Sequence, residues 1–233
     1  MTRPVRSLRE AASFVDRVGI ALVFPRDGIP LPSLWEAVAG DQQVEWVIEK
    51  EDGTKDFSPE MERVWSWKDE LPAQKRACAG KHLRGWATLV SLKVLPSLYA
   101  LTGLPAREDG FRQTELSSLE REVAEAVLVL GPLSSPELRQ AIGCEDTARV
   151  NRALDLLQRK LVLTKAGTVT QGQGWPAGTY DVLARRYKLG RLPDEEVARL
   201  DIARTINAPD APTLARTTGW DKREAARIFG ALT

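Results

Sequence analysis

The feature that most constrains the fold is an amphipathic helix predicted from Glu145-Asp146 to about residue 161. Its apolar residues follow the 3.6-residue helical period and form a single stripe, made of Val150, Ala153, Leu154, Leu157 and Leu161. A helix of this length with one apolar stripe is stable mainly when neighbouring elements cover that stripe. The segment therefore predicts a small helical unit built around this helix.

Two shorter helices are predicted immediately before it, and their ends are well marked. Ser117 and Glu120 form a capping box, and Gly131-Pro132 ends the helix that they begin. Ser134 and Glu137 form a second capping box at the start of a short helix. Helix, short helix and longer helix therefore follow one another with only brief turns between them.

The residues after the long helix predict a short β-hairpin. Leu161–Lys165 and Thr168–Gln173 flank Ala166-Gly167, which suits two short strands joined by a small turn. Helix, short helix, turn, longer helix and hairpin is the order of elements in a winged helix, whose hairpin forms the wing.

An internal repeat indicates a second unit of the same kind. A shift of 76 residues superimposes LSSPELRQAIGC, which ends at Cys144, on PDAPTLARTTGW, which ends at Trp220. Each stretch lies between two predicted helices. The predicted fold class is mainly α with small β elements (α+β), with tandem winged-helix or helix-turn-helix units. The expected domains are a mixed α/β region at 1–113, a winged helix at 114–190 and a partial helix-turn-helix unit at 191–233.

The N-terminal region is less regular. Ser7 and Glu10 begin a first helix, and Asp52-Gly53 indicates a hairpin turn. Residues 83–101 fit a helix and a strand equally well. Core packing and stacking on nucleobases are both open interpretations for the four tryptophans of this region, Trp46, Trp65, Trp67 and Trp86.

Charge is balanced over the whole chain but not along it. The 233 residues carry 33 Lys and Arg against 32 Asp and Glu, which excludes a strongly basic coat and an acidic tail. The stretch 71–107 contains no acid, and its basic residues are Lys75, Arg76, Lys81, Arg84, Lys93 and Arg107. Such a stretch predicts a positive field that attracts phosphate backbones, unless the acidic segment 1–60 neutralises it in the folded chain.

The predicted long helix carries a second basic group. At about 100° per residue, Arg149, Arg152 and Arg159 lie opposite the apolar stripe. Guanidinium groups placed in this way can reach phosphates or guanine edges in a major groove, although an ordinary solvated helix face has the same pattern. The candidate nucleic-acid-binding residues are Arg149, Arg152, Arg159, Lys165, Lys75, Arg76, Lys81 and Arg84.

Other features exclude several classes of protein. No apolar run approaches the ~20 residues of a membrane span, and the N-terminus does not have the pattern of a signal peptide. Cys78 and Cys144 are expected to remain unbonded in a reducing compartment. The single histidine, His82, cannot support a His-based metal cluster. We expect a cytoplasmic protein with no cofactor and no metal site.

Tandem winged helices preceded by VWSWKDELPAQKRACAGKHL at residues 64–83 resemble the AlkZ-related proteins. These are bacterial relatives of the helix-turn-helix-42 DNA glycosylases, which excise alkylated purines. The resemblance extends over nearly the whole chain. It implies tandem winged-helix modules around a concave surface that faces DNA. It also implies a reactive Gln-apolar-Gln or Gln-apolar-Asp motif, which orients a water at the sugar carbon.

The sequence departs from that motif. The Gln-x-Gln that it contains, Gln171-Gly172-Gln173, has glycine at its centre and lies on the predicted wing, where a polar tip is typical. Asp69 and Glu70 are candidate carboxylates that suit a surface or capping role equally. Cys78 lies near several cations, which favour a reactive thiolate, but an inert core residue is the alternative. Because a fold does not imply a function, the catalytic residues stay unassigned.

Three functions are consistent with these observations. The first is a winged-helix protein that binds double-stranded DNA in DNA repair or lesion recognition. The second is an active DNA glycosylase with an unrecognised catalytic pair, and the third is a non-catalytic scaffold for a protein partner. The near-neutral charge favours the scaffold, whereas the acid-free stretch and the arginine face favour DNA binding.

Overall fold

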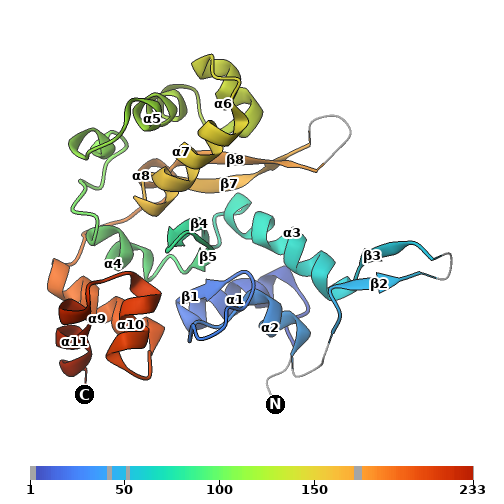
Figure 1. Cartoon of the computed structure of the whole chain (residues 1–233), viewed down its shortest axis with the longest axis horizontal. Coiled ribbons are helices and arrows are strands. Elements are labelled where there is room, and N and C mark those ends of the chain that lie inside the picture. The colour runs from blue at the N-terminus through green and yellow to red at the C-terminus, as the bar shows by residue number, and fades with distance from the viewer. Residues whose placement is uncertain (1–3, 41–43, 51–52, 171–174, 233) are drawn as a thin grey trace.

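The computed structural model describes residues 4–40, 44–50, 53–170 and 175–232. The architecture is mixed α+β, as expected. Its centre is a six-stranded sheet of order β1-β5-β4-β7-β8-β6, to which the helices are attached (Figure 1). A separate two-stranded hairpin projects from one end of the molecule.

The N-terminal half of the sheet comes from one compact run of elements. They are α1 (Leu8–Val18), β1 (Ile20–Leu22), α2 (Leu34–Ala39), α3 (Pro59–Ala73), β4 (Cys78–Leu83) and β5 (Trp86–Val90). Strand β5 pairs antiparallel with both β1 and β4. The projecting hairpin, β2 (Val47–Glu49) and β3 (Lys55–Phe57), is inserted between α2 and α3. It spans the turn predicted at Asp52-Gly53, of which Asp52 lies outside the described residues.

The second half of the sheet repeats this order. Its elements are α5 (Ser118–Leu130), β6 (Leu133–Ser134), α6 (Ser135–Ile142), α7 (Thr147–Arg159), β7 (Leu163–Val169) and β8 (Ala177–Val182). Strand β8 pairs antiparallel with both β6 and β7, as β5 does with β1 and β4. Helix, strand, helix, helix, strand, strand therefore occurs twice, in residues 8–90 and 118–182.

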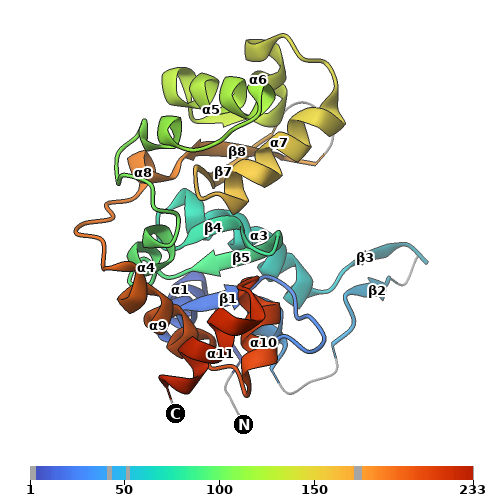
Figure 2. The same ribbon diagram turned by 60° about the vertical axis from the view of Figure 1, so that its left-hand side comes forward.

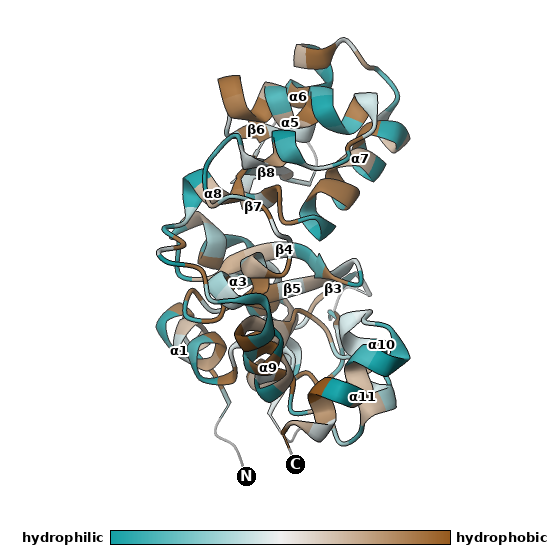
Figure 3. Cartoon of the chain, turned by 90° about the vertical axis from the view of Figure 1, so that its left-hand side faces the viewer, coloured by the Kyte–Doolittle hydropathy of each residue, from teal (hydrophilic) through white to brown (hydrophobic). Residues whose placement is uncertain are grey.

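The remaining elements connect these halves and extend the C-terminus. They are α4 (Leu95–Ala100), the 3₁₀ helix η1 (Gly110–Gln113), α8 (Leu183–Arg186), α9 (Glu195–Ile206), α10 (Ala211–Thr218) and α11 (Lys222–Gly230). Helix α9 packs against α4. Both α10 and α11 alternate hydrophilic and hydrophobic segments, as amphipathic helices do (Figure 3). The three helices predicted in the second copy of the 76-residue repeat are thus present.

Local signals in the sequence place most helix ends correctly. The capping boxes at Ser117 and Ser134 both form, with each serine Oγ accepting from the backbone N–H three residues later. The prediction of a turn at Ala166-Gly167 is wrong. Strand β7 continues through these residues, and Gly167, with φ of 145°, lies at a bulge where the register against β8 shifts.

Residues 83–101 contain both a strand, β5, and a helix, α4. Successive residues of β5 face two different cores, so that Val90 belongs to one and Leu89 to the other. A strand buried on both faces shows no alternation of polar and apolar residues. This is why the pattern alone did not separate strand from helix.

The two halves of the sheet meet where β4 pairs with β7 at Ala79 and Lys165. Thr164 is fully buried, and its Oγ1 donates to the Ala79 carbonyl at 2.9 Å. The ring of His82 on β4 hydrogen-bonds through Nδ1 to the Gln158 carbonyl at the end of α7, also at 2.9 Å. These buried polar contacts fasten β4 to both β7 and α7, and we call this set of contacts the β4–β7 junction.

The chain after β8 also crosses back to the first half. Tyr187 Oη donates to the Ala77 carbonyl at 2.9 Å, just before β4. The Nη2 of Arg186 donates to the carbonyls of Pro72 and Ala166, at 2.5 and 3.0 Å. One guanidinium therefore joins the end of α3 to β7.

Burial controls the chemistry of the two titratable side chains in the β4–β7 junction. Cys78 Sγ lies 3.3 Å from both His82 Nε2 and Thr164 Oγ1. Burial raises the pKa of the Cys78 thiol to about 12 and lowers the pKa of His82 to about 4. The structure therefore favours the inert core residue over the reactive thiolate at Cys78. Both Cys78 and Cys144 carry free thiols.

The lowered pKa of His82 predicts a pH-dependent stability. The unfolded chain takes up this proton near pH 6.5, whereas the folded chain takes it up near pH 4. The contribution of neutral His82 to the free energy of unfolding is therefore fully present above pH 6.5. This contribution falls as the pH decreases, and about 2 kcal/mol is lost by pH 5. Urea unfolding at pH 7.5, 6 and 5 measures it. The His82→Gln variant should show a much flatter dependence over this range, and equal slopes would contradict the assignment.

Candidate nucleic-acid interface

A cavity of about 340 Å³ lies where the two halves of the chain meet. Residues of α3, β4, β5, α7, β7 and β8 surround it, so it exists only when the β4–β7 junction is formed. We call it the junction cavity. Its polar lining is Lys68, Lys81, Thr88, Asn151, Asp155, Gln158, Lys165 and Tyr180.

Helix α7 presents two different faces to this region. Its predicted apolar stripe is buried, and Asn151, Asp155 and Gln158 line the junction cavity. The three arginines predicted to face outward, Arg149, Arg152 and Arg159, are exposed. Within the described part of the chain, no carboxylate forms an ion pair with any of the three. Their guanidinium groups are available to an external anion.

The two candidate lysines nearest to the β4–β7 junction are already paired. Lys81 Nζ lies 2.5 Å from Asp155 Oδ2, and Lys165 Nζ forms a close ion pair with Asp69 Oδ1. The stretch 71–107 is acid-free along the sequence, but Lys81 pairs with Asp155 of α7 and Arg107 pairs with Asp109. Among the described residues, the acids that form ion pairs with this stretch therefore come from outside the acidic segment 1–60.

A third lysine, Lys68 on α3, shares the carboxylate of Asp69. Its Nζ lies 2.7 Å from Asp69 Oδ2, and both side chains are 15% exposed. Burial, followed by the nearby Lys165 ammonium, lowers the pKa of Lys68. Asp69 therefore forms ion pairs with both Lys68 and Lys165, and its carboxylate is not free to act on a substrate.

Two of the candidate arginines, Arg84 and Arg159, lie at the turn between β4 and β5. Leu83 pairs with Trp86, and the two intervening residues, Arg84 and Gly85, have φ of 53° and 80°, as a type I′ hairpin turn requires. The guanidinium of Arg159 lies so close to Gly85 that a Cβ there would collide with it. Arg159 thus lies against the residue that follows Arg84, although 75 positions separate the two arginines in the sequence.

Arg84 also reaches the C-terminal helices. A Cβ added at Gly219, in the turn between α10 and α11, would lie 3.1 Å from Arg84 Cδ. Lys75 and Arg76 occupy the turn between α3 and β4, are exposed, and are not among the residues that line the cavities described here. The eight predicted residues therefore divide into three groups. Lys81 and Lys165 form ion pairs within the protein, and Lys75 and Arg76 lie in a separate turn. The remaining four, which we call the free arginine group, are Arg84, Arg149, Arg152 and Arg159.

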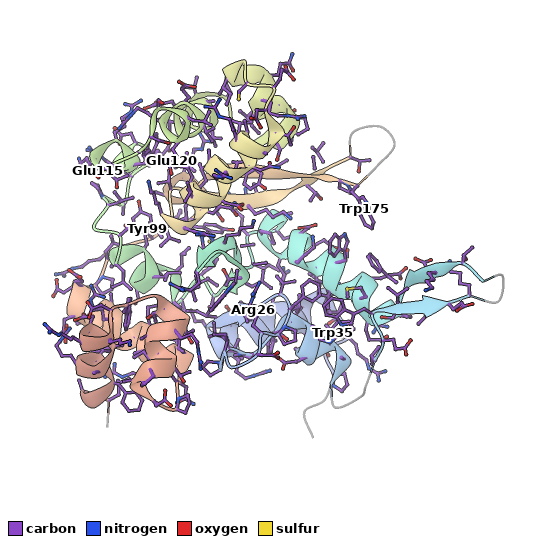
Figure 4. All side chains as sticks on the ribbon, in the orientation of Figure 1. Arg26, Trp35, Tyr99, Glu115, Glu120 and Trp175 are labelled. Atoms are coloured by element: carbon purple, nitrogen blue, oxygen red, sulfur yellow. The ribbon has the colours of Figure 1, made fainter. Side chains whose placement is uncertain are left out.

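A second cavity, of about 500 Å³, adjoins the first and shares Lys68 and Lys165 with it. Its aromatic lining is Phe57 of β3, Trp65 of α3 and Trp175, which lies two residues before the start of β8. Figure 4 shows Trp175 pointing from the end of the β7–β8 hairpin towards α3. Sequence reasoning listed Trp65 among several tryptophans but missed Trp175, Phe57 and Lys68. No local signal brings these three segments together.

Gln171 and Gln173 lie outside the described residues, so the predicted wing-tip role of this pair stays a prediction. No helix among the described residues is long and apolar enough to cross a membrane. Within the same residues, no group of three or more His, Cys, Asp or Glu side chains is arranged to hold a metal ion.

Comparison with known proteins gives a family and a fold. The family model described as AlkZ related matches residues 5–206. Among solved structures, the chain is similar to the Streptomyces sahachiroi DNA glycosylase AlkZ, with a TM-score of 0.54 and 14% identity. The alignment covers 99% of this chain but 60% of that one, and at this identity the likeness concerns the fold alone. No curated protein sequence matches.

The two ion pairs of Asp69 predict that this residue stabilises the fold. The Asp69→Asn change keeps the volume of the side chain but leaves the Lys68 and Lys165 ammonium groups facing each other without a counter-charge. We expect a loss of about 2 kcal/mol in the free energy of unfolding, measured by urea titration. The neighbouring Glu70→Gln change is the control and should stay within ~0.5 kcal/mol. Equal stability of the two variants would show that Asp69 is an ordinary surface residue.

Proposed function

The chain belongs to the AlkZ-related family, and from this premise we propose that it is a winged-helix protein that binds double-stranded DNA in DNA repair or lesion recognition. A solved structure of similar fold is a DNA glycosylase, which supports a role at DNA. The observation that carries the proposal for this chain is the row of exposed arginines on α7, which form no ion pair with the described residues.

The repeated order of elements supports two winged-helix units. In residues 8–90 and 118–182 the first short strand pairs with the last strand, and the third helix, α3 or α7, precedes the hairpin. In helix-turn-helix proteins, the second helix of the motif lies in the major groove and contacts bases with its N-terminal residues. Arg149 and Arg152 occupy that part of α7.

The distribution of ion pairs supports the same surface. Lys81 and Lys165 are neutralised by carboxylates of the protein itself, so they release few counterions when a phosphate approaches. Arg149, Arg152 and Arg159 have no such partner among the described residues. We infer that the arginines make the phosphate contacts and that the paired lysines hold the two units together.

The free arginine group continues towards the C-terminal helices. Arg159 lies against Gly85, and the preceding residue, Arg84, lies against Gly219 in the turn between α10 and α11. Figure 2 shows α7 and α10 on the same side of the molecule, above and below β5. A duplex that follows this side would contact α7 first and the α10–α11 turn next.

This proposal predicts salt-dependent duplex binding. The affinity should fall with salt, and each phosphate contact should contribute about −0.9 to the slope of log affinity against log salt concentration. The double variant Arg149→Ala/Arg152→Ala should flatten that slope by about two. Its melting temperature should hardly change, since substitutions of exposed residues usually stay within ~0.5 kcal/mol. Fluorescence anisotropy of a labelled duplex at several salt concentrations measures the slope.

A matched control removes two arginines elsewhere. Arg9 and Arg17 on α1 do not line the two cavities, and the variant Arg9→Ala/Arg17→Ala should keep the wild-type slope. A wild type without salt-sensitive duplex binding would contradict the proposal and favour the protein scaffold. Release of free base from an alkylated duplex in the same samples would identify the glycosylase alternative.

A further inference from the structure

Three aromatic rings, from β3, α3 and the segment before β8, meet at the second cavity. The ring centroids of Trp65 and Trp175 are 5.6 Å apart and inclined by 67°, and Phe57 lies 5.8 and 5.9 Å from them. Trp175 is 71% exposed and Trp65 is 37% exposed. Exposure of large aromatic side chains to water is unfavourable in free energy, so an exposed cluster of this kind indicates a binding surface for a ligand or a macromolecule.

Trp175 provides the open face of this cluster. One face of Trp65 is already covered, because the Lys68 ammonium lies 4.1 Å from its ring centroid. Because the two tryptophan rings are inclined by 67°, a flat ligand that is parallel to one of them cannot be parallel to the other. Trp175 is the more exposed of the two rings, so a flat ligand would stack on Trp175.

The polar lining selects the chemistry of the ligand. Glu62 and Glu70 line the cavity together with the rings. Lys68 and Lys165 also line it, but both are paired with Asp69. The two glutamates repel a phosphate but accept hydrogen bonds from the amino groups of nucleobases. An aromatic face combined with acceptors fits the flat, amino-bearing part of a nucleotide better than its backbone.

The position of the second cavity indicates that the ligand could come from a bound duplex. It shares Lys68 and Lys165 with the junction cavity, which α7 also lines. A duplex held by the arginines of α7 would therefore lie next to the aromatic cluster. A base that leaves the duplex stack on this side has the aromatic surface of the second cavity to receive it.

We propose that Trp175, supported by Trp65 and Phe57, is a stacking site for an unpaired nucleobase of duplex DNA. The proposal rests on the duplex binding proposed above and adds a preference for DNA that contains an unpaired or extrahelical base. Trp46 provides a contrast within the same chain, because it is 49% exposed but packs against Phe24 and Trp35, outside this cavity.

The test compares two labelled duplexes that differ by one unpaired 2-aminopurine. Stacking on an aromatic side chain changes affinity by roughly 5- to 150-fold per base, so the wild type should bind the bulged duplex at least about fivefold more tightly than the perfect one. Trp175→Ala should remove most of this preference and keep the affinity for the perfect duplex. Because Trp175 is exposed, its truncation should leave the melting temperature nearly unchanged.

A second measurement follows stacking directly. The fluorescence of 2-aminopurine falls when the base stacks, so binding of the wild type should quench it and binding of Trp175→Ala should not. Trp65→Ala should weaken the quenching, because it removes the side support of Trp175. Trp46→Ala is the matched control and should behave as the wild type in both measurements.

The outcomes separate this proposal from the proposed function. Equal affinity of the wild type for both duplexes, without quenching, would overturn the stacking site while duplex binding stands. A preference that Trp175→Ala and Trp65→Ala both retain would also overturn it, and would leave the cluster as a docking surface for a protein. Absence of binding to either duplex would overturn the proposed function and the stacking site together.

Discussion

The pairing of β4 with β7 is the contact on which the rest of the structure depends. Ala79 and Lys165 form the register pair, and the Thr164 hydroxyl and the His82 ring add buried hydrogen bonds on either side of it. Without this pairing, the two repeated units would share no sheet. Because His82 is fastened to Gln158, the same contact fixes the end of α7 against β4 and so sets the direction in which its arginines face.

The β4–β7 junction also decides which cations are free. It brings Lys81 of β4 next to Asp155 of α7, and Lys165 of β7 next to Asp69 of α3. Both ion pairs join one repeated unit to the other, so the positive charges of these two lysines are neutralised within the protein. The arginines on the outer side of α7 are left as the charge available to a partner. A chain of nearly zero net charge can in this way present a local cationic surface.

Much of the second half of the fold could be predicted from the sequence, because its signals are local. Ser117, Ser134 and Asp146 cap helices at the predicted places, and the apolar stripe of α7 is buried as its period indicates. The equivalent unit in residues 8–90 was missed. Its second and third helices are separated by an inserted hairpin, and its strand β5 is buried on both faces.

The candidate site was predicted only in part, for a related reason. A charge pattern identifies cations such as Lys81 and Lys165 but not their partners, which lie 74 and 96 positions away in the sequence. The aromatic cavity depends on the contact of Trp175 with Phe57 and Trp65, which precede it by more than 100 positions. Contacts of this range are set by topology, and periodicity within a short window carries no information about them.

Hydrogen exchange with and without duplex DNA tests most directly whether the β4–β7 junction builds the proposed DNA-binding surface. Binding should slow the exchange of amides in the first turns of α7 and in the β4–β5 turn at Arg84 and Gly85. Amides of α1, on which the control arginines lie, should exchange as in the free protein. Slowed exchange confined to α1, or no change in α7, would contradict the account.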